Sequence, residues 1–402
     1  MAEYDKWAAR GALLAATARS ALRGGRLALE QRSSTGPGVN VVRYQGGGLG
    51  LEAMARFIVA ALGEAGLPST TYQLAIEPGS SPSTSSTDGL ITERTLSLVN
   101  SAHTASAAMQ FPRLFSPNRT RWGMWHWELM TVPPAQRLGL PFVDEVWTTS
   151  TFQQAAFRTA TNKPVRVIPI PVEVPDLGEG GRLRARLGLH DTFLFGHQSD
   201  LASSGERKNP SAVVESYVRA FALPSADQHL VVKVVHGEGS AEWDRVRRLG
   251  AGRPDITLAD EFWPQDVIED FFLDLDCYVS LHRSEGFGLT MAQAMANATP
   301  VIATDYSGNM DFMDDGTAAL VGHRLVPVGP NPVYPADGTW AEPDLDAAVD
   351  WMRRLTQDRA FAVALGGRGR EHVVATRSPE ALVRWIRATV GVDGPPPDGG
   401  SR

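Results

Sequence analysis

Cysteine is nearly absent from this sequence of 402 residues, in which Cys277 is the only one. An intramolecular disulfide and a cysteine-based zinc site are therefore excluded, and we expect a reducing compartment such as the cytoplasm. No apolar run approaches the ~20 residues of a membrane-spanning helix, and the charged N-terminus does not have the form of a signal peptide. Positive charge is not in excess either, because the sequence contains 38 Lys and Arg but 45 Asp and Glu. This balance argues against a nucleic-acid-binding protein.

What the sequence does contain is a repeated alternation of strand-like and helix-like segments. In the first half, strand patterns at 39–44 and 71–76 flank a helical pattern at 51–65. The second half restarts the same order at 193–197. Strands that alternate with helices predict parallel sheets, so the expected fold class is α/β, with two Rossmann-like domains facing a central cleft.

Changes in composition indicate where these domains begin and end. A Pro- and Gly-rich stretch near 172–180 separates the two halves. We expect an N-terminal helical extension at 1–35, a first Rossmann-like domain at 36–172, a second at 173–375, a helix at 376–392 that crosses back to the first domain, and a disordered tail at 393–402. The amphipathic extension mixes acidic with basic residues, so packing on the domain is the blander alternative to peripheral contact with a membrane.

A glycine-rich stretch follows the first strand and precedes a helix, where backbone N–H groups can approach an anion. Gly47 and Gly48 lie in this stretch, whose order Gly-Gly-Gly-Leu-Gly at 46–50 departs from the full dinucleotide fingerprint. A merely tight turn is one alternative interpretation. A nicotinamide-dependent dehydrogenase, with Glu77 on the ribose, is another.

Two adjacent cations, Arg207 and Lys208, follow the first strand of the second half. Arginine binds phosphate bidentately and lysine supplies a mobile point charge, so the pair suits a diphosphate. The alternative is a solvated run of charges, which is the usual fate of such a segment.

The most specific pattern is the stretch SLHRSEGFGLTMAQAMA at 280–296. It predicts that a strand ends, that Glu285 lies in a loop flanked by glycine, and that Gln293 follows on a helix beginning near 290. Another strand pattern, at 301–304, comes next.

This stretch resembles the signature of retaining GT-B glycosyltransferases of family 4, in which seven residues separate two glutamates within E-G-F-G-L…E-A-M-A…P-V-I-A. The resemblance is nearly continuous over 193–327, and the segments 122–128, 143–150 and 165–172 look like the N-terminal half of the family. It implies the GT-B architecture and metal-independent transfer of a sugar, of the hexosyltransferase type, with retention at the anomeric carbon. The donor implied is a nucleoside diphosphate sugar, UDP- or GDP-linked, and the acceptor is a hydroxyl of a glycan, a lipid or a small natural product. No other cofactor is implied.

The resemblance also implies roles for individual residues. Catalytic roles fall to Glu285, His126, Arg207 and Lys208. Donor-binding roles fall to Gly47, Gly48, Arg207, Lys208, Glu285, Gly286, Phe287, Gly288, Leu289 and Gln293. Candidates on the acceptor side are Asn100, His103, Trp125 and Glu128, with core packing as the alternative for Trp125.

Gln293 departs from the family pattern, because it stands where the second glutamate accepts hydrogen bonds from the ribose hydroxyls. Glutamine can still accept through its carbonyl oxygen, but it lacks the charge assistance. This departure keeps open a non-catalytic protein of the same fold. Asp274 and Asp276 form a D-x-D pair, but they precede a strand pattern instead of following one, so we expect capping or turn roles. No other cluster has metal-ligand spacing, and no metal site is expected.

Overall fold

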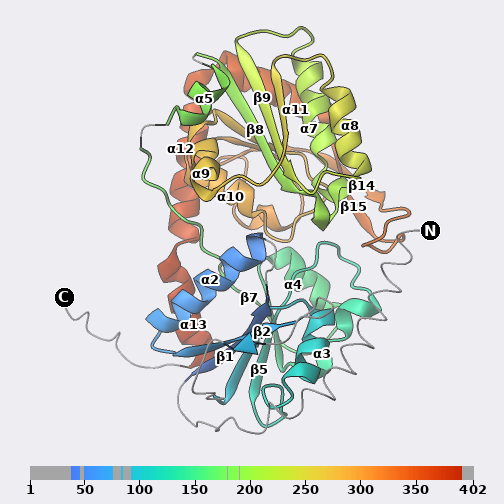
Figure 1. The fold of residues 1–402 in the computed structure, drawn as a ribbon, viewed down its shortest axis with the longest axis vertical. Helices are drawn as coiled ribbons and strands as arrows, with labels where there is room; N and C mark the ends of the chain where they lie inside the picture. The colour runs from blue at the N-terminus through green and yellow to red at the C-terminus, as the bar shows by residue number, and fades with distance from the viewer. Residues whose placement is uncertain are drawn as a thin grey trace, which may run out of the picture. The chain divides into compact units, whose positions relative to one another are not determined.

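The structure is a computed structural model that describes residues 38–45, 49–75, 83–84, 92–178, 180–189 and 191–391. The predictions for the 1–35 extension, the 393–402 tail, Gly47, Gly48 and Glu77 lie outside the described residues. The chain divides into two compact units, each described by itself below (Figure 1). Unit 1 contains the chain as far as Pro171, Pro330–Pro335 and the chain from Pro379, whereas unit 2 contains Val172–Gly329 and Ala336–Ser378.

Unit 1 is built around a sheet whose strands lie in the order β3-β2-β1-β4-β5-β6-β7. β3 pairs antiparallel with β2, and the other pairs are parallel. The strands are β1 (Val39–Tyr44), β2 (Ser69–Leu74), β3 (Ser83–Thr84), β4 (Arg94–Ser97), β5 (Thr120–Met124), β6 (Glu145–Thr148) and β7 (Val165–Val167). The helices are α2 (Leu49–Glu64), α3 (Ser101–Gln110), α4 (Thr151–Arg158) and α13 (Pro379–Val390), with 3₁₀ turns η2 (Pro134–Arg137) and η3 (Leu140–Phe142).

The apolar pattern of the sequence accounts for the packing around β1. This strand is buried along nearly its whole length, as expected for a central parallel strand that is covered on both faces. Ile58, Ala61 and Leu62 of α2 are buried at helical spacing and form the apolar stripe of that helix. α13 packs against α2, and Arg387 donates a hydrogen bond to the Glu64 carbonyl oxygen at 2.8 Å.

Unit 2 is built around a parallel sheet with the strand order β10-β9-β8-β11-β12-β13, followed by an antiparallel hairpin of β14 and β15. The strands are β8 (Phe193–Asp200), β9 (Gln228–Val235), β10 (Ile256–Asp260), β11 (Cys277–Ser280), β12 (Val301–Thr304), β13 (Ala319–Val321), β14 (His323–Pro327) and β15 (Thr339–Pro343). The helices are α5 (Arg182–Leu187), α6 (Gly205–Lys208), α7 (Pro210–Ala220), α8 (Ala241–Leu249), α9 (Gln265–Asp274), α10 (Leu289–Ala296), α11 (Leu345–Gln357) and α12 (Arg359–Thr376), with 3₁₀ turns η4 (Leu201–Ser203) and η5 (Gly308–Asp311).

The limits of the two units differ from the domains expected from the sequence by up to three residues at the boundaries, and by one internal segment. The change from unit 1 to unit 2 after Pro171 lies close to the boundary expected between 172 and 173. Pro330–Pro335, however, was expected within the second domain and belongs to unit 1. The reason is local packing, because the Tyr334 ring lies 5.3 Å from the ring of Trp127 and its hydroxyl donates to Glu128 at 3.0 Å.

The D-x-D pair has the structural role that its position before a strand predicts. Asp274 is buried at the end of α9 and accepts hydrogen bonds from the backbone N–H groups of Gly181, Leu183 and Arg184, at 2.7 Å for Leu183. It therefore caps the first turn of α5 from a neighbouring element. Asp276 accepts from the Leu194 N–H at 2.7 Å and pairs with Arg184. The capping interpretation is thus confirmed.

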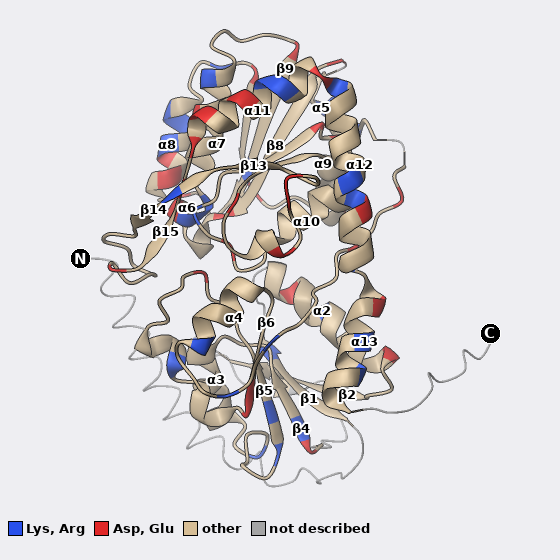
Figure 2. Cartoon of the chain, turned by 180° about the vertical axis from the view of Figure 1, so that it is seen from behind, with Lys and Arg blue, Asp and Glu red and all other residues tan. Residues whose placement is uncertain are grey.

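Charged side chains of both signs are interspersed over the outer helices. Figure 2 shows acidic and basic segments alternating along α8 and α12, and on α8 the pair Asp244–Arg247 lies within one turn. Such mixed faces are typical of solvated helices and need no further explanation.

Candidate active site

The loop after β8 places two cations at the carboxyl edge of the unit 2 sheet. Asp200 begins this loop by accepting a hydrogen bond from the Ala202 N–H at 2.9 Å, and the short α6 then carries Arg207 and Lys208. Asn209 ends α6 in a left-handed conformation, and its side-chain amide donates to the Leu281 carbonyl oxygen at 2.8 Å. Pro210 then starts α7, where its missing N–H costs nothing. The carboxyl edge of parallel strands is where α/β folds bind ligands.

A second loop, after β11, carries Glu285 to the same edge. The Glu285 N–H donates to Ser307 Oγ at 2.7 Å, and the Gly308 N–H donates to the Glu285 carbonyl oxygen at 2.9 Å. Gly308 has to be glycine, since a Cβ there would lie 2.1 Å from the Gly286 carbonyl oxygen. The loop after β12 therefore fixes the backbone of Glu285 from the side.

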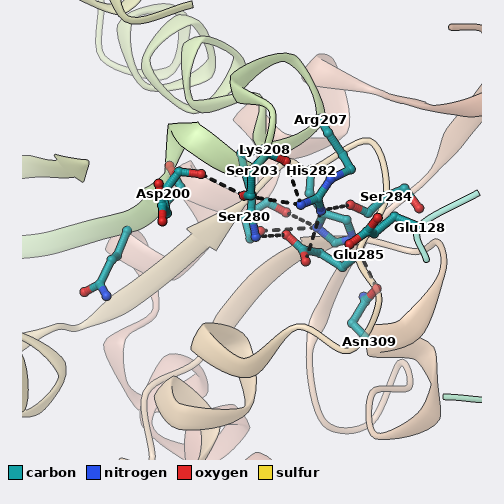
Figure 3. Close-up of polar contacts among 12 residues, drawn as sticks. Glu128, Asp200, Ser203, Arg207, Lys208, Ser280, His282, Ser284, Glu285 and Asn309 are labelled. Carbon is teal, nitrogen blue, oxygen red and sulfur yellow. Dashed lines mark hydrogen bonds and ion pairs between the residues drawn. The ribbon is translucent and has the colours of Figure 1, made fainter. Parts of the chain in front are cut away.

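The two cations and Glu285 form one ion cluster, although 77 residues separate them in the chain (Figure 3). Lys208 Nζ lies 2.6 Å from Glu285 Oε1, and Arg207 Nη1 lies 3.2 Å from Oε2. Burial alone would raise the pKa of Glu285, but the charges of Lys208 and Arg207 lower it to about 2. The carboxylate is therefore ionised at neutral pH and takes up part of the positive charge of both partners.

Arg207 is 2% exposed, so it is not part of a solvated charge run. Its guanidinium donates to the Ser284 carbonyl oxygen at 2.7 Å and to the Ser203 carbonyl oxygen at 3.2 Å. Lys208 keeps about a fifth of its side chain exposed. The two cations are therefore not equivalent: Arg207 ties two loops together, whereas Lys208 is the one that solvent reaches.

Sequence reasoning missed His282 and Asn309, which join the loops behind Glu285. His282 is fully buried, and its Nε2 lies 3.1 Å from Asn309 Oδ1 and 3.2 Å from the Tyr306 carbonyl oxygen. Burial lowers the pKa of His282, although the nearby Glu285 charge raises it. Asn309 in turn donates to the Thr304 carbonyl oxygen at 3.0 Å. In the sequence, only their positions could have indicated a role. His282 comes shortly after β11, and Asn309 lies in the turn η5 that follows β12.

The remaining donor-side candidates separate into backbone and side-chain contributors. Gly288, with φ of 95°, precedes α10, which starts at Leu289. The Phe287 ring is buried 5.2 Å from the ring of Phe312, so it belongs to the core, whereas Leu289 is partly exposed. Gln293 is half-buried on α10, and its side-chain amide makes no hydrogen bond to the described part of the chain.

In unit 1, the acceptor-side candidates Asn100 and His103 and the catalytic candidate His126 gather beside Tyr44, at the carboxyl ends of β1, β4 and β5. Tyr44 was not predicted, yet its hydroxyl accepts from the Asn100 N–H at 3.0 Å and lies 2.8 Å from His103 Nδ1. The tautomer of His103 sets which of these two groups donates the hydrogen bond. The Asn100 side-chain oxygen accepts from the His126 N–H at 3.3 Å.

His126 and Glu128 follow β5, but Trp125 does not face a ligand. Burial lowers the pKa of His126 to about 4, so this imidazole is neutral at pH 7. Glu128 accepts from the Tyr334 hydroxyl at 3.0 Å. The acceptor-side prediction for Trp125 is wrong, because its ring is fully buried and its Nε1 donates to Thr104 Oγ1 at 3.0 Å. Trp125 packs in the core, which was the alternative interpretation.

No cluster of three or more His, Cys, Asp or Glu suited to a metal ion occurs in the part of the chain that the structure describes. Within the same residues, no helix has the length and apolarity needed to cross a membrane.

Solved structures define the class of this fold. The Anabaena protein HepE, crystallised with UDP-glucose, superposes with a TM-score of 0.64 at 13% identity, covering 88% of this chain and 99% of that one. Sucrose-phosphate synthase from Thermosynechococcus elongatus gives a TM-score of 0.64 at 17% identity, covering 89% and 99%. The chain thus has the α/β, two-domain GT-B fold, as the sequence predicts.

Sequence comparison finds a family model over part of the chain. Residues 205–331, which include the ion cluster, match the family model of glycosyl transferases group 1. The resemblance seen at 280–296 is therefore confirmed at the level of group 1 glycosyltransferases.

Curated relatives match over limited stretches. A D-inositol 3-phosphate glycosyltransferase from Thermomonospora curvata is 30% identical over 159 residues, which are 36% of this chain and 35% of the relative. A poly(ribitol-phosphate) alpha-N-acetylglucosaminyltransferase from Staphylococcus aureus is 23% identical over 186 residues, 45% of this chain and 33% of the relative. The matches span about a third of the length of these relatives.

Proposed function

We propose that the protein is a retaining glycosyltransferase of the hexosyltransferase type. It moves a sugar from a nucleoside diphosphate donor to an acceptor hydroxyl. The observation that carries this proposal is the ion cluster of Arg207, Lys208 and Glu285 at the carboxyl edge of the unit 2 sheet. The group 1 family match over the same residues supports it.

The chemistry of the cluster suits departure of a nucleoside diphosphate. Breaking the bond between the anomeric carbon and the β-phosphate oxygen builds negative charge on the phosphate, which Lys208 and Arg207 can stabilise. The anomeric carbon becomes positively charged at the same time, and the Glu285 carboxylate carries the opposite charge. In the retaining reaction the acceptor oxygen attacks from the face that the leaving group vacates, and its proton passes to the departing phosphate oxygen.

The donor proposed is UDP- or GDP-linked. Structures of the Anabaena protein with UDP and with UDP-glucose are consistent with this donor class. The relatives' names mention inositol phosphate and poly(ribitol-phosphate), which are rich in hydroxyl groups. We therefore propose a polyol or glycan acceptor, with lipid and natural-product acceptors as further choices. Asn100, His103 and Glu128 lie on the acceptor side in this proposal, and His126 is a catalytic residue.

Family 4 membership, independence from metal ions and a cytoplasmic location belong to the same proposal. Transfer should continue in excess EDTA, because Lys208 and Arg207 supply the charge that a metal ion would otherwise provide. Activity that disappears with EDTA and returns with Mg²⁺ or Mn²⁺ would contradict this part of the proposal. The single buried cysteine is compatible with a reducing compartment.

The test is a thermal-shift screen of the purified chain with UDP, GDP, ADP, dTDP, NAD and NADP, followed by turnover assays with the matching nucleotide sugars. A ligand that binds the folded state stabilises it by mass action, so a cognate diphosphate at a hundred times its Kd adds about 2.7 kcal/mol. Stabilisation by NAD or NADP alone would favour the dehydrogenase alternative. Binding of a nucleotide sugar without turnover would favour a non-catalytic protein of the same fold, an alternative that rests on Gln293 in place of the second glutamate of the family pattern.

A further inference from the structure

A buried lysine in unit 2 has no role in the chemistry described so far. Lys233 lies on β9, is 1% exposed, and makes no hydrogen bond or ion pair with the described residues. Its Nζ lies 6.0 Å from the centroid of the Trp263 ring. Burial lowers the pKa of Lys233, and the more distant carboxylates of Asp200, Glu261 and Asp260 raise it. A buried ammonium without a direct partner is costly, which suggests that a bound group supplies one.

A second unpartnered polar group lies beside it. Gln198 on β8 is the register partner of Lys233, so the two side chains extend from the same face of the sheet. Its side-chain oxygen Oε1 is buried and accepts no hydrogen bond from the described part of the chain. The backbone of Gln198 is held by the Tyr278 hydroxyl, which donates to its carbonyl oxygen at 3.0 Å. Neighbouring strands thus present a donor and an acceptor, both without partners.

The position of this pair relative to the ion cluster indicates what could bind it. Arg207 and Lys208 follow β8, and the sheet order places β9 and then β10 on one side of that strand. After β10, the ring of Phe262 is 63% exposed, and His236 packs against it edge-on at 5.4 Å. His236 is itself held by Asp200 at 2.8 Å. Lys233, His236 and Phe262 therefore all lie on the β9–β10 side of the strand that leads to the two cations.

We propose that Lys233 selects the base of the donor by donating a hydrogen bond to a carbonyl oxygen of that base. The proposal rests on the nucleotide-sugar function above and adds a residue that determines which nucleotides bind. A lysine ammonium has donors only. Uracil O4 and guanine O6 accept hydrogen bonds, whereas the exocyclic amino groups of cytosine and adenine donate them. Lys233 therefore favours UDP over CDP and GDP over ADP.

The experiment measures Kd for UDP, CDP, GDP and ADP by calorimetric titration of the full chain and of Lys233→Met. A charge-assisted hydrogen bond corresponds to roughly a tenfold to hundredfold change in Kd. The wild type should prefer each carbonyl base by about this factor, and Lys233→Met should bring both ratios close to one. Arg248→Met removes the same charge from an exposed position on α8 and should leave both ratios unchanged. A Lys233→Leu variant, which also lacks a hydrogen-bond donor, replaces the methionine variant if that one does not fold.

The outcomes separate the inference from the function on which it rests. Equal affinity of the wild type for UDP and CDP, or an unchanged preference in Lys233→Met, overturns the role of Lys233 while nucleotide binding stands. A purely structural lysine would change the melting temperature and affect all four nucleotides alike, which also overturns it. If none of the nucleotides binds the wild type, the proposed function fails together with the inference.

Discussion

Glu285→Gln is the substitution that examines the ion cluster most directly. It keeps the shape of the side chain and removes the charge that now pairs with Lys208 at 2.6 Å and with Arg207 at 3.2 Å. Both cations then lose this counter-charge. We expect UDP to bind more tightly to the variant, because it no longer shares the cations with a carboxylate. We expect kcat to fall by about a hundredfold or more, because the charge facing the anomeric carbon is lost.

The pKa of Glu285 sets the size of these effects. Its value falls from 4.5 to about 2 in the folded chain, which corresponds to roughly 3 kcal/mol in favour of the charged form. The downward shift gives the direction of the competition for the cations, and one charge-assisted contact corresponds to a Kd for UDP about tenfold to hundredfold lower. The folded pKa lies below the unfolded one, so the stability that Glu285 contributes is present above pH 4.5 and is lost as the pH falls toward 2.

Titration calorimetry measures the Kd for UDP, and steady-state kinetics measure kcat. Urea unfolding at pH 7 and at pH 3 measures the free energy of unfolding. The variant should be less stable than the wild type at pH 7, and the gap should narrow at pH 3. Glu371→Gln removes an exposed carboxylate on α12 and serves as the matched control. Weaker or unchanged UDP binding in Glu285→Gln would refute the competition between carboxylate and diphosphate. An undiminished kcat in Glu285→Gln would contradict the proposal that the active centre lies at the carboxyl edge of the unit 2 sheet.

Two further substitutions address binding and stability separately. Gln293→Glu should lower the donor KM several-fold with kcat little changed, because a carboxylate accepts more strongly than the free amide; a raised KM would mean that the glutamine is adapted to its donor. Asp274→Ala should cost about 1–2 kcal/mol in urea unfolding, since it removes the cap of α5, and should leave kcat unchanged. A loss of activity in a stable Asp274→Ala variant would show that this carboxylate has a functional role beyond capping α5.

The sequence predicts much of this fold because its local patterns agree with the tertiary structure. The alternation of strands and helices gives the two parallel sheets, and the stretch at 280–296 gives the loop of Glu285 and helix α10. Both depend on short-range periodicity, which a single sequence displays. Trp125 illustrates the limit, because an aromatic residue after a strand looks the same whether it lines a site or fills the core.

The state of the ion cluster also lay beyond sequence reasoning. The spacing suggested that Arg207 and Lys208 serve a diphosphate, but not that Arg207 is buried. Its contacts with Ser284 and Glu285 mean that Arg207→Ala would leave a buried carboxylate with one partner fewer. Arg207 is the cation that turns inward. Its orientation depends on the left-handed turn at Asn209 and on the contact of that residue with Leu281, which is distant in the chain.

The return of the chain to unit 1 through α13 has a consequence for the order in which the protein acquires its structure. Trp385 packs edge-on against Trp147 at 4.8 Å, and α13 covers α2. These partners emerge from the ribosome more than two hundred residues apart, after all of unit 2 has been made. The half of the molecule that is encoded second can therefore complete its packing first. Until α13 is made, Trp147 and α2 of unit 1 lack the partners that cover them. Unit 1 is therefore the part that depends most on protection from aggregation during synthesis.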